Sequence, residues 1–99
     1  MKKHFYIAMD DGTKKEVFGE PLAVGRFKCF YLVEDHGEFD KVTINEYYSG
    51  MKVCDIITPD FISPHRKAEQ LFNEHDEQTI IKHCKGVLQH AGLSYPLNV

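Results

Sequence analysis

Hydrophobic and polar positions alternate along the first sixty residues, a period that is typical of β-strands. Phe5 and Ile7 alternate with their neighbours, and Asp11-Gly12 supplies the positive φ angles that a hairpin turn needs. The predicted strands are residues 4–9, 14–18, 26–34, 41–48 and 51–56. Short turns between them indicate an antiparallel meander of about five strands within residues 3–57.

Glycine and proline mark the connections between these strands. Gly19, Pro21 and Gly25 predict a loop or an edge strand, because proline cannot donate to a strand ladder and glycine has no side chain to pack. Ser49-Gly50 predicts a second, two-residue hairpin turn. Segment 26–34 has hydrophobic residues on both faces, which predicts a central strand.

Beyond residue 60 the hydrophobic period becomes helical. Ser63-Pro64 is a helix start signal, because serine caps free N–H groups and proline loses nothing at the first helical position. Asp76 is a second predicted N-cap, and Gly92 a predicted C-terminal cap. These signals predict helices at about 63–74 and 76–91.

A sheet with one apolar face and two amphipathic helices predict a two-layer α+β fold, with both helices on one face of the sheet. No repeat, linker or low-complexity tract interrupts the 99 residues, so we expect a single compact domain over 1–99. The hydrophobic run 5–9 is too short for a signal peptide, and no stretch approaches a membrane span. We therefore expect no signal peptide, no transmembrane segment and a cytoplasmic protein.

The net charge is −3 at pH 7, and the excess of acidic residues lies within the first 60 residues. Proteins dedicated to nucleic-acid binding usually carry a clustered basic surface that neutralises phosphates. The overall charge therefore disfavours such a function. The near-neutral C-terminal part remains the region where an anionic partner would meet least repulsion.

Three cysteines, Cys29, Cys54 and Cys84, are far apart and form no C-x-x-C pair, which predicts free thiols in a reducing compartment. Cys29 and Cys84 fall on apolar faces, where the pKa of a thiol rises, and the charge of Asp55 would raise that of Cys54. No thiol has a basic neighbour in sequence, and no catalytic motif occurs. We therefore expect no enzyme, no catalytic residue and no cofactor.

The sequence contains two groups of residues of the types that bind metals, one of histidines and one of carboxylates, and neither has the spacing of a metal site. His83 and His90 are seven residues apart, and two helical turns, about 10.5 Å, are too long for one ion to bridge. Loop 34–40 carries four carboxylates around Gly37 but lacks the order of an EF-hand. The sequence favours solvated histidines and a solvated hairpin connection, and predicts no metal site.

Two surfaces could bind a nucleic acid. Arg26 and Lys28 lie near Phe30 and Tyr6 in the predicted sheet, and bases stack on aromatic side chains beside cations. Gln78, Lys82, Lys85 and Gln89 form a polar stripe on the second helix, which an amphipathic helix also needs simply for solvation. The candidate nucleic-acid contacts are Arg26, Lys28, Lys82 and Lys85.

Hydrophobic and aromatic residues near the second hairpin and in the C-terminal tail suggest an interface, because tyrosine and methionine are enriched there. The candidate interface residues are Tyr47, Tyr48, Met51, Leu93, Tyr95 and Leu97. We predict a small non-enzymatic protein-interaction or regulatory and accessory module that self-associates, as a homodimer, through an edge strand or the tail. The alternative is a nucleic-acid-binding protein, and the second alternative is a small metal- or thiol-dependent enzyme.

Overall fold

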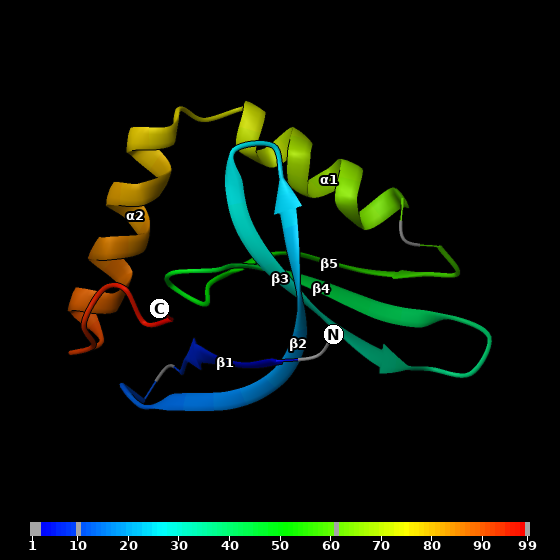
Figure 1. Ribbon diagram of the computed structural model, residues 1–99, viewed down its shortest axis with the longest axis horizontal. Helices are drawn as coiled ribbons and strands as arrows, with labels where there is room; N and C mark the ends of the chain where they lie inside the picture. The colour runs from blue at the N-terminus through cyan, green and yellow to red at the C-terminus, as the bar shows by residue number, and fades with distance from the viewer. Residues whose placement is uncertain (1–2, 10, 61, 99) are drawn as a thin grey trace.

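Five antiparallel strands are followed by two helices that pack on the sheet, as Figure 1 shows for the computed structural model, which describes residues 3–9, 11–60 and 62–98. The strand order β1-β2-β3-β4-β5 is that of a meander. The predicted α+β fold is thus confirmed. The elements are β1 Lys3–Ala8, β2 Lys14–Val24, β3 Phe27–Asp35, β4 Asp40–Glu46, β5 Lys52–Thr58, α1 Ile62–Asn73 and α2 Glu77–His90.

The long strand β2 changes its partner along its length. Its residues 14–19 pair with β1 and its residues 20–24 pair with β3, and Figure 1 shows the curve that joins the two parts. A Cβ on Gly19 would lie 2.7 Å from the carbonyl oxygen of Tyr31, so the bend needs glycine. Pro21 is tolerated because the pairing with β1 ends before it. The loop that the sequence predicted here is therefore a bend in a continuous strand, and the edge-strand alternative fits residues 20–24, which pair with β3 alone.

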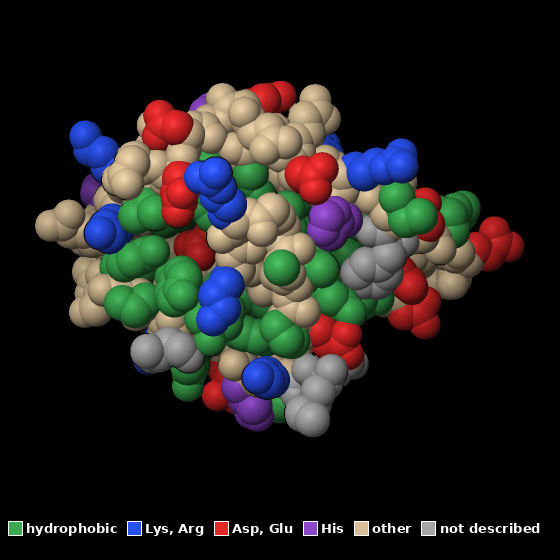
Figure 2. All heavy atoms as spheres, turned by 45° about the horizontal axis from the view of Figure 1, so that its top comes forward, with side chains coloured by type: hydrophobic (Ala, Val, Ile, Leu, Met, Phe, Trp, Pro, Cys, Tyr) green, Lys and Arg blue, Asp and Glu red, His purple; other side chains and the backbone are tan. Residues whose placement is uncertain are grey.

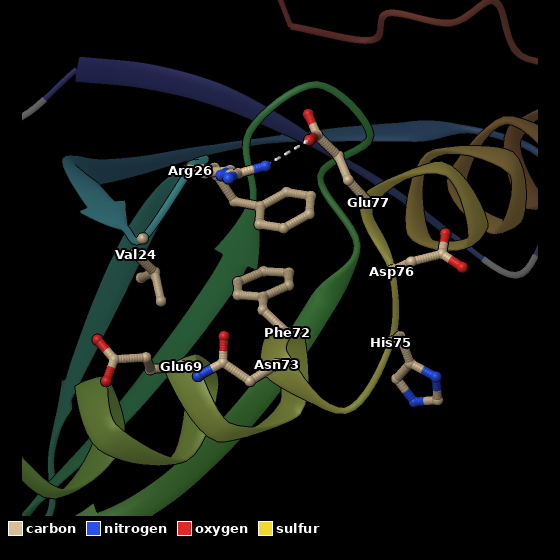
Figure 3. A pocket seen from close by; sticks show the side chains of 10 residues that line it. Val24, Arg26, Glu69, Phe72, Asn73, His75, Asp76 and Glu77 are labelled. Atoms are coloured by element: carbon tan, nitrogen blue, oxygen red, sulfur yellow. Dashed lines mark ion pairs between the residues drawn. The ribbon is translucent and has the colours of Figure 1, made fainter.

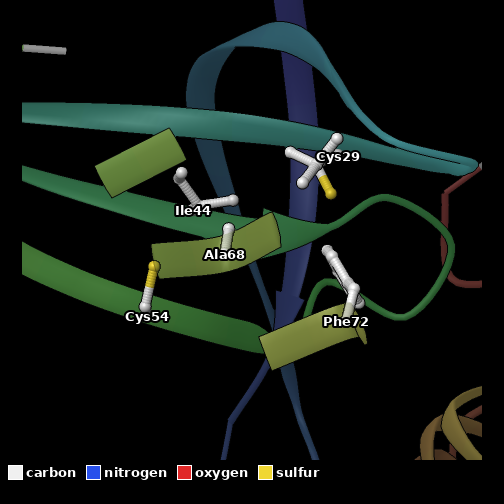
Figure 4. Packing of buried hydrophobic residues seen from close by; sticks show 6 residues of the cluster. Cys29, Ile44, Cys54, Ala68 and Phe72 are labelled. Atoms are coloured by element: carbon white, nitrogen blue, oxygen red, sulfur yellow. The ribbon is translucent and has the colours of Figure 1, made fainter. Parts of the chain in front are cut away.

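The main core lies between the sheet and α1. Figure 4 shows Cys29, Ile44 and Cys54 on the strands facing Ala68 and Phe72 on the helix. Phe72 also stacks on Phe27 of β3, with the ring centres 4.2 Å apart. Burying such side chains contributes about 1.5–3 kcal/mol each.

The opposite face of β3 is covered by β1. Phe30 is fully buried there and stacks on Phe5 of β1, with the ring centres 4.2 Å apart. β3 therefore buries side chains on both faces, as predicted for a central strand. Because Phe30 is buried, its ring is not available to stack on a nucleic-acid base.

An aspartate side chain caps the start of each helix. The side chain of Asp60 accepts a hydrogen bond from the backbone N–H of Ser63 at 2.8 Å, so it takes the capping role that the sequence assigned to Ser63. Asp76 caps α2 as predicted, accepting from the N–H of Thr79 at 2.7 Å. α2 ends at His90 with Ala91 as its C-cap, and the predicted capping glycine, Gly92, follows directly with a φ of +78°. Within the described residues, both helices fall short of the length and hydrophobicity that crossing a membrane requires.

Candidate functional site

The turn between β4 and β5 is organised around a buried carboxylate. The side chain of Glu46, a residue that is 6% exposed, accepts hydrogen bonds from the backbone N–H groups of Tyr48 at 2.7 Å and Ser49 at 3.0 Å. Satisfying this charge widens the connection to residues 47–51, so the two-residue turn predicted at Ser49-Gly50 is wrong. Sequence reasoning missed Glu46, because nothing in its neighbours signals that it is buried.

The C-terminal tail packs along this turn. The backbone N–H of Leu97 donates to the carbonyl of Tyr48. Asn98 ties three segments together: its Oδ1 accepts from the N–H of Tyr6 at 2.7 Å, and its Nδ2 donates to the carbonyls of Tyr6 at 2.9 Å and Tyr47 at 2.8 Å. The tail therefore joins β1 to the β4–β5 turn.

The six candidate interface residues lie in the β4–β5 turn and in the tail. Tyr47 and Tyr48 are in edge-to-face contact at 5.0 Å, and Tyr48 lies 6.3 Å from Tyr95. All six, including Met51, Leu93 and Leu97, are half-buried. Much of their hydrophobic surface is thus covered within one chain.

A cavity of about 270 Å³, here called the α2 pocket, opens between the turn, the start of β3, α2 and the tail. Glu46 and Cys84 are its most buried residues. Burial raises the pKa of Tyr95, and the neighbouring charge of Glu46 raises it further. The α2 pocket is lined by Arg26, Phe27, Lys28, Glu46, Tyr48, Glu77, Ile80, Ile81, Cys84 and Tyr95.

Cations surround the α2 pocket. Lys28 Nζ lies 4.8 Å from the ring centre of Tyr47, and Lys85 Nζ lies 5.4 Å from that of Tyr95. The exposed guanidinium of Arg26 is 3.9 Å from the carboxylate of Glu77. The structure thus brings Arg26, Lys28 and Lys85 of the nucleic-acid hypothesis together with tyrosines of the interface hypothesis. Lys82 is exposed elsewhere on α2.

A second cavity, of about 510 Å³, adjoins the α2 pocket at Arg26, Phe27 and Glu77. Figure 3 shows Arg26 and Glu77 facing each other beside Phe72, with Glu69 and Asn73 of α1 nearby. The Arg26–Glu77 ion pair therefore lies between the two cavities, next to the β2–β3 turn.

The three thiols are buried and free. Burial raises the pKa of Cys29 to about 12, and the charge of Glu46 adds to the effect. Burial is also the main cause of the raised pKa of Cys54, with Asp55 a smaller one as the sequence predicted. Burial likewise raises the pKa of Cys84, against a lowering by the hydrogen bond with Ser49. Such thiols are poor sources of a reactive thiolate.

The structure also places the histidines and the acidic loop. His83 and His90 are exposed on α2. In the loop, the Asp35 side chain accepts from the N–H of Gly37 at 2.9 Å and so supports the turn itself. Among the described residues, no three His, Cys, Asp or Glu side chains group in a way that could hold a metal ion.

Exposed hydrophobic side chains gather at the other end of the sheet. Figure 1 shows that the β3–β4 loop, the end of β5 and the start of α1 all lie at this end, and Figure 2 shows hydrophobic side chains among acidic ones there, on the right of the view. β5 is the last strand of the sheet. The β5 end, as we call it, carries Val33, Phe39, Ile57 and Ile62, which are 50%, 45%, 61% and 63% exposed.

The fold and these surfaces define a two-layer α+β protein with a mixed-charge pocket at one end and a hydrophobic strand edge at the other. Comparison with protein-family models, curated proteins and solved structures finds no match to the chain. The function must therefore be argued from the two surfaces themselves.

Proposed function

We propose that this chain is a small non-enzymatic interaction module that self-associates through the edge of β5. The observation that carries the proposal is the β5 end: β5 is an edge strand, and four of the six large exposed hydrophobic residues in the described chain lie at this end of the sheet, with Ile57 on β5 itself. An unpaired strand edge is a template for pairing with another chain. These side chains are already about half buried, so covering the rest contributes about half of the roughly 1.5–3 kcal/mol that full burial gives.

A second copy of the chain is a suitable partner for this edge, because it offers the same hydrophobic residues and because the charge on β5 is offset within each chain. Antiparallel pairing of β5 with its own copy is a symmetric contact that uses the same surface twice. Asp55, at the centre of β5, would approach its symmetry mate, but two lysines of its own chain offset its charge: Lys41 at 3.7 Å and Lys52 at 3.4 Å. Repulsion between the two strands is thereby reduced.

The raised pKa values of the three thiols support a role without thiol chemistry. A nucleophilic cysteine needs a lowered pKa or an adjacent base. In this chain, burial raises the pKa of each thiol and so favours its protonated form. This observation favours the interaction module over a thiol-dependent enzyme.

Sedimentation equilibrium across a range of concentrations tests the proposal. The wild-type mass should rise with concentration from 11.5 kDa towards twice that value. Ile57→Lys should remain monomeric, because a charge would replace the hydrophobic contact at the strand edge. Phe18→Lys is the matched control, since Phe18 is also 61% exposed but lies on β2. A wild type that stays monomeric throughout, or a control that dissociates equally, contradicts the proposal.

Nucleic-acid binding remains the second candidate, and one observation favours it. Lys28 and Lys85 lie over tyrosine rings, a combination that suits single-stranded nucleic acids. Glu46 and Glu77 in the same pocket would oppose a phosphate chain. Fluorescence anisotropy with labelled DNA and RNA at low and high salt distinguishes the candidates. Salt-sensitive binding that Lys82→Glu with Lys85→Glu abolishes would favour this second function.

A further inference from the structure

The α2 pocket holds a buried carboxylate that lacks a cationic partner. Glu46 is 6% exposed, and among the described residues no Lys, Arg or His lies within 4.0 Å of its carboxylate oxygens. Two backbone N–H groups and the thiol of Cys84 satisfy part of its hydrogen-bonding capacity, and an ionised carboxylate offers about four acceptor positions. A cation placed in the α2 pocket would therefore meet a charge that water screens poorly.

Aromatic rings flank the same carboxylate. The ring centres of Tyr48 and Tyr95 are 6.3 Å apart and the rings are tilted by 48°. An ammonium group within about 6 Å of a ring centre is attracted by the ring quadrupole. The lysines of the chain already show this preference, since Lys28 Nζ lies 5.9 Å from the centre of Tyr48 and Lys85 Nζ 5.4 Å from that of Tyr95.

The remaining lining suits a short aliphatic chain. Ile80 and Ile81 of α2 provide hydrophobic walls, and the volume of about 270 Å³ limits the occupant to a small group. The positive charges at the rim are less influential than Glu46, because the Arg26 side chain is 85% exposed and is offset by Glu77. Lys28 and Lys85 are likewise exposed, where water screens their charges.

We propose that the α2 pocket binds a primary alkylammonium group, with the ammonium at Glu46 between Tyr48 and Tyr95 and the alkyl chain against Ile80 and Ile81. Two sources share this chemistry: a free alkylamine and the side chain of a lysine on a partner protein. The site lies at the opposite end of the sheet from the β5 end and does not depend on self-association.

NMR titration with two probes tests the site. The probes are n-butylammonium chloride and an acetylated, amidated Gly-Lys-Gly peptide, with n-butanol and the matching norleucine peptide as uncharged controls. We expect saturable shifts at the β4–β5 turn and α2 for at least one charged probe. Saturation by n-butylammonium alone assigns the site to a free amine, and saturation by the peptide alone assigns it to a lysine side chain.

Variants complete the test. Glu46→Gln should abolish binding, and because it also alters the turn, Tyr95→Leu provides a second variant that should weaken binding about tenfold. Lys82→Ala, on another part of α2, should bind like the wild type. The proposal is overturned if neither charged probe saturates, if the norleucine peptide binds equally well, or if inorganic phosphate binds the α2 pocket more tightly than n-butylammonium.

Discussion

Single residues hold β1 against the β4–β5 turn. Gly50 has a φ of +69°, and a Cβ at this position would clash with the carbonyl oxygen of Tyr6. Asn98 bonds the backbone of the same two segments from the tail. Glu46 shapes the turn itself through two backbone N–H groups. The position of the β4–β5 turn, which supplies Glu46 and Tyr48 to the α2 pocket, therefore depends on a few close contacts between distant parts of the chain.

Gly50→Ala should destabilise the protein far more than Gly37→Ala. Gly37 also has a positive φ, +87°, but an added Cβ meets nothing within 4 Å. The control should lose about 1–2 kcal/mol from its left-handed backbone alone. Gly50→Ala should lose at least about 3 kcal/mol, because the clash with the backbone of β1 adds to the same penalty. Urea unfolding of both variants gives the comparison, and equal losses would contradict the close approach.

The pKa of Cys29 makes stability fall in alkaline solution. The pKa is raised from 9.0 to about 12, so between these values the unfolded chain loses a proton that the folded chain keeps. The free energy of unfolding should then fall by about 1.4 kcal/mol per pH unit from this residue. Cys29→Ala should show a shallower decline above pH 9 in urea unfolding, whereas the raised pKa values of Tyr31 and Tyr95 affect both proteins alike. Parallel declines would show that Cys29 ionises freely.

At the scale of the elements, the sequence predicted correctly those features that depend on residues close together in the chain. Asp76 and Gly92 lie within one turn of the helix ends that they determine, and both predictions are confirmed. The bend in β2 escaped prediction because it depends on the distant carbonyl of Tyr31, which leaves no room for a side chain at Gly19. The capping role of Asp60 was assigned to Ser63, since both residue types suit that position.

Two glycines in these elements should respond in opposite ways to alanine. Gly86 lies within α2, and an added Cβ meets nothing within 4 Å. Gly86→Ala should therefore raise the free energy of unfolding by about 1 kcal/mol, the difference in helix propensity. Gly19→Ala should lower it, because the Cβ would clash with β3. Thermal unfolding measures both, and a destabilised Gly86→Ala would show that this face of α2 is occupied.

At the scale of the whole molecule, the two candidate surfaces lie at opposite ends of the sheet. The α2 pocket combines side chains from β3, the β4–β5 turn, α2 and the tail, so no sequence window contains it. The sequence identified Tyr48 and Tyr95 as candidate interface residues and Arg26 and Lys28 as candidate nucleic-acid contacts. Only the fold places these four residues around one pocket. The sequence predicted self-association through an edge strand or the tail without naming the strand, and the hydrophobic residues of the β5 end come from three separate segments.

Amide hydrogen exchange as a function of protein concentration tests self-association through β5 most directly. The proposal predicts that protection of the Lys52–Thr58 amides rises with concentration, because a second copy pairs with the free edge of the strand. The amides of β3, which already has a partner on each side, serve as the internal reference. Protection in β5 that stays constant while the molecular mass rises would place the interface elsewhere and contradict the account.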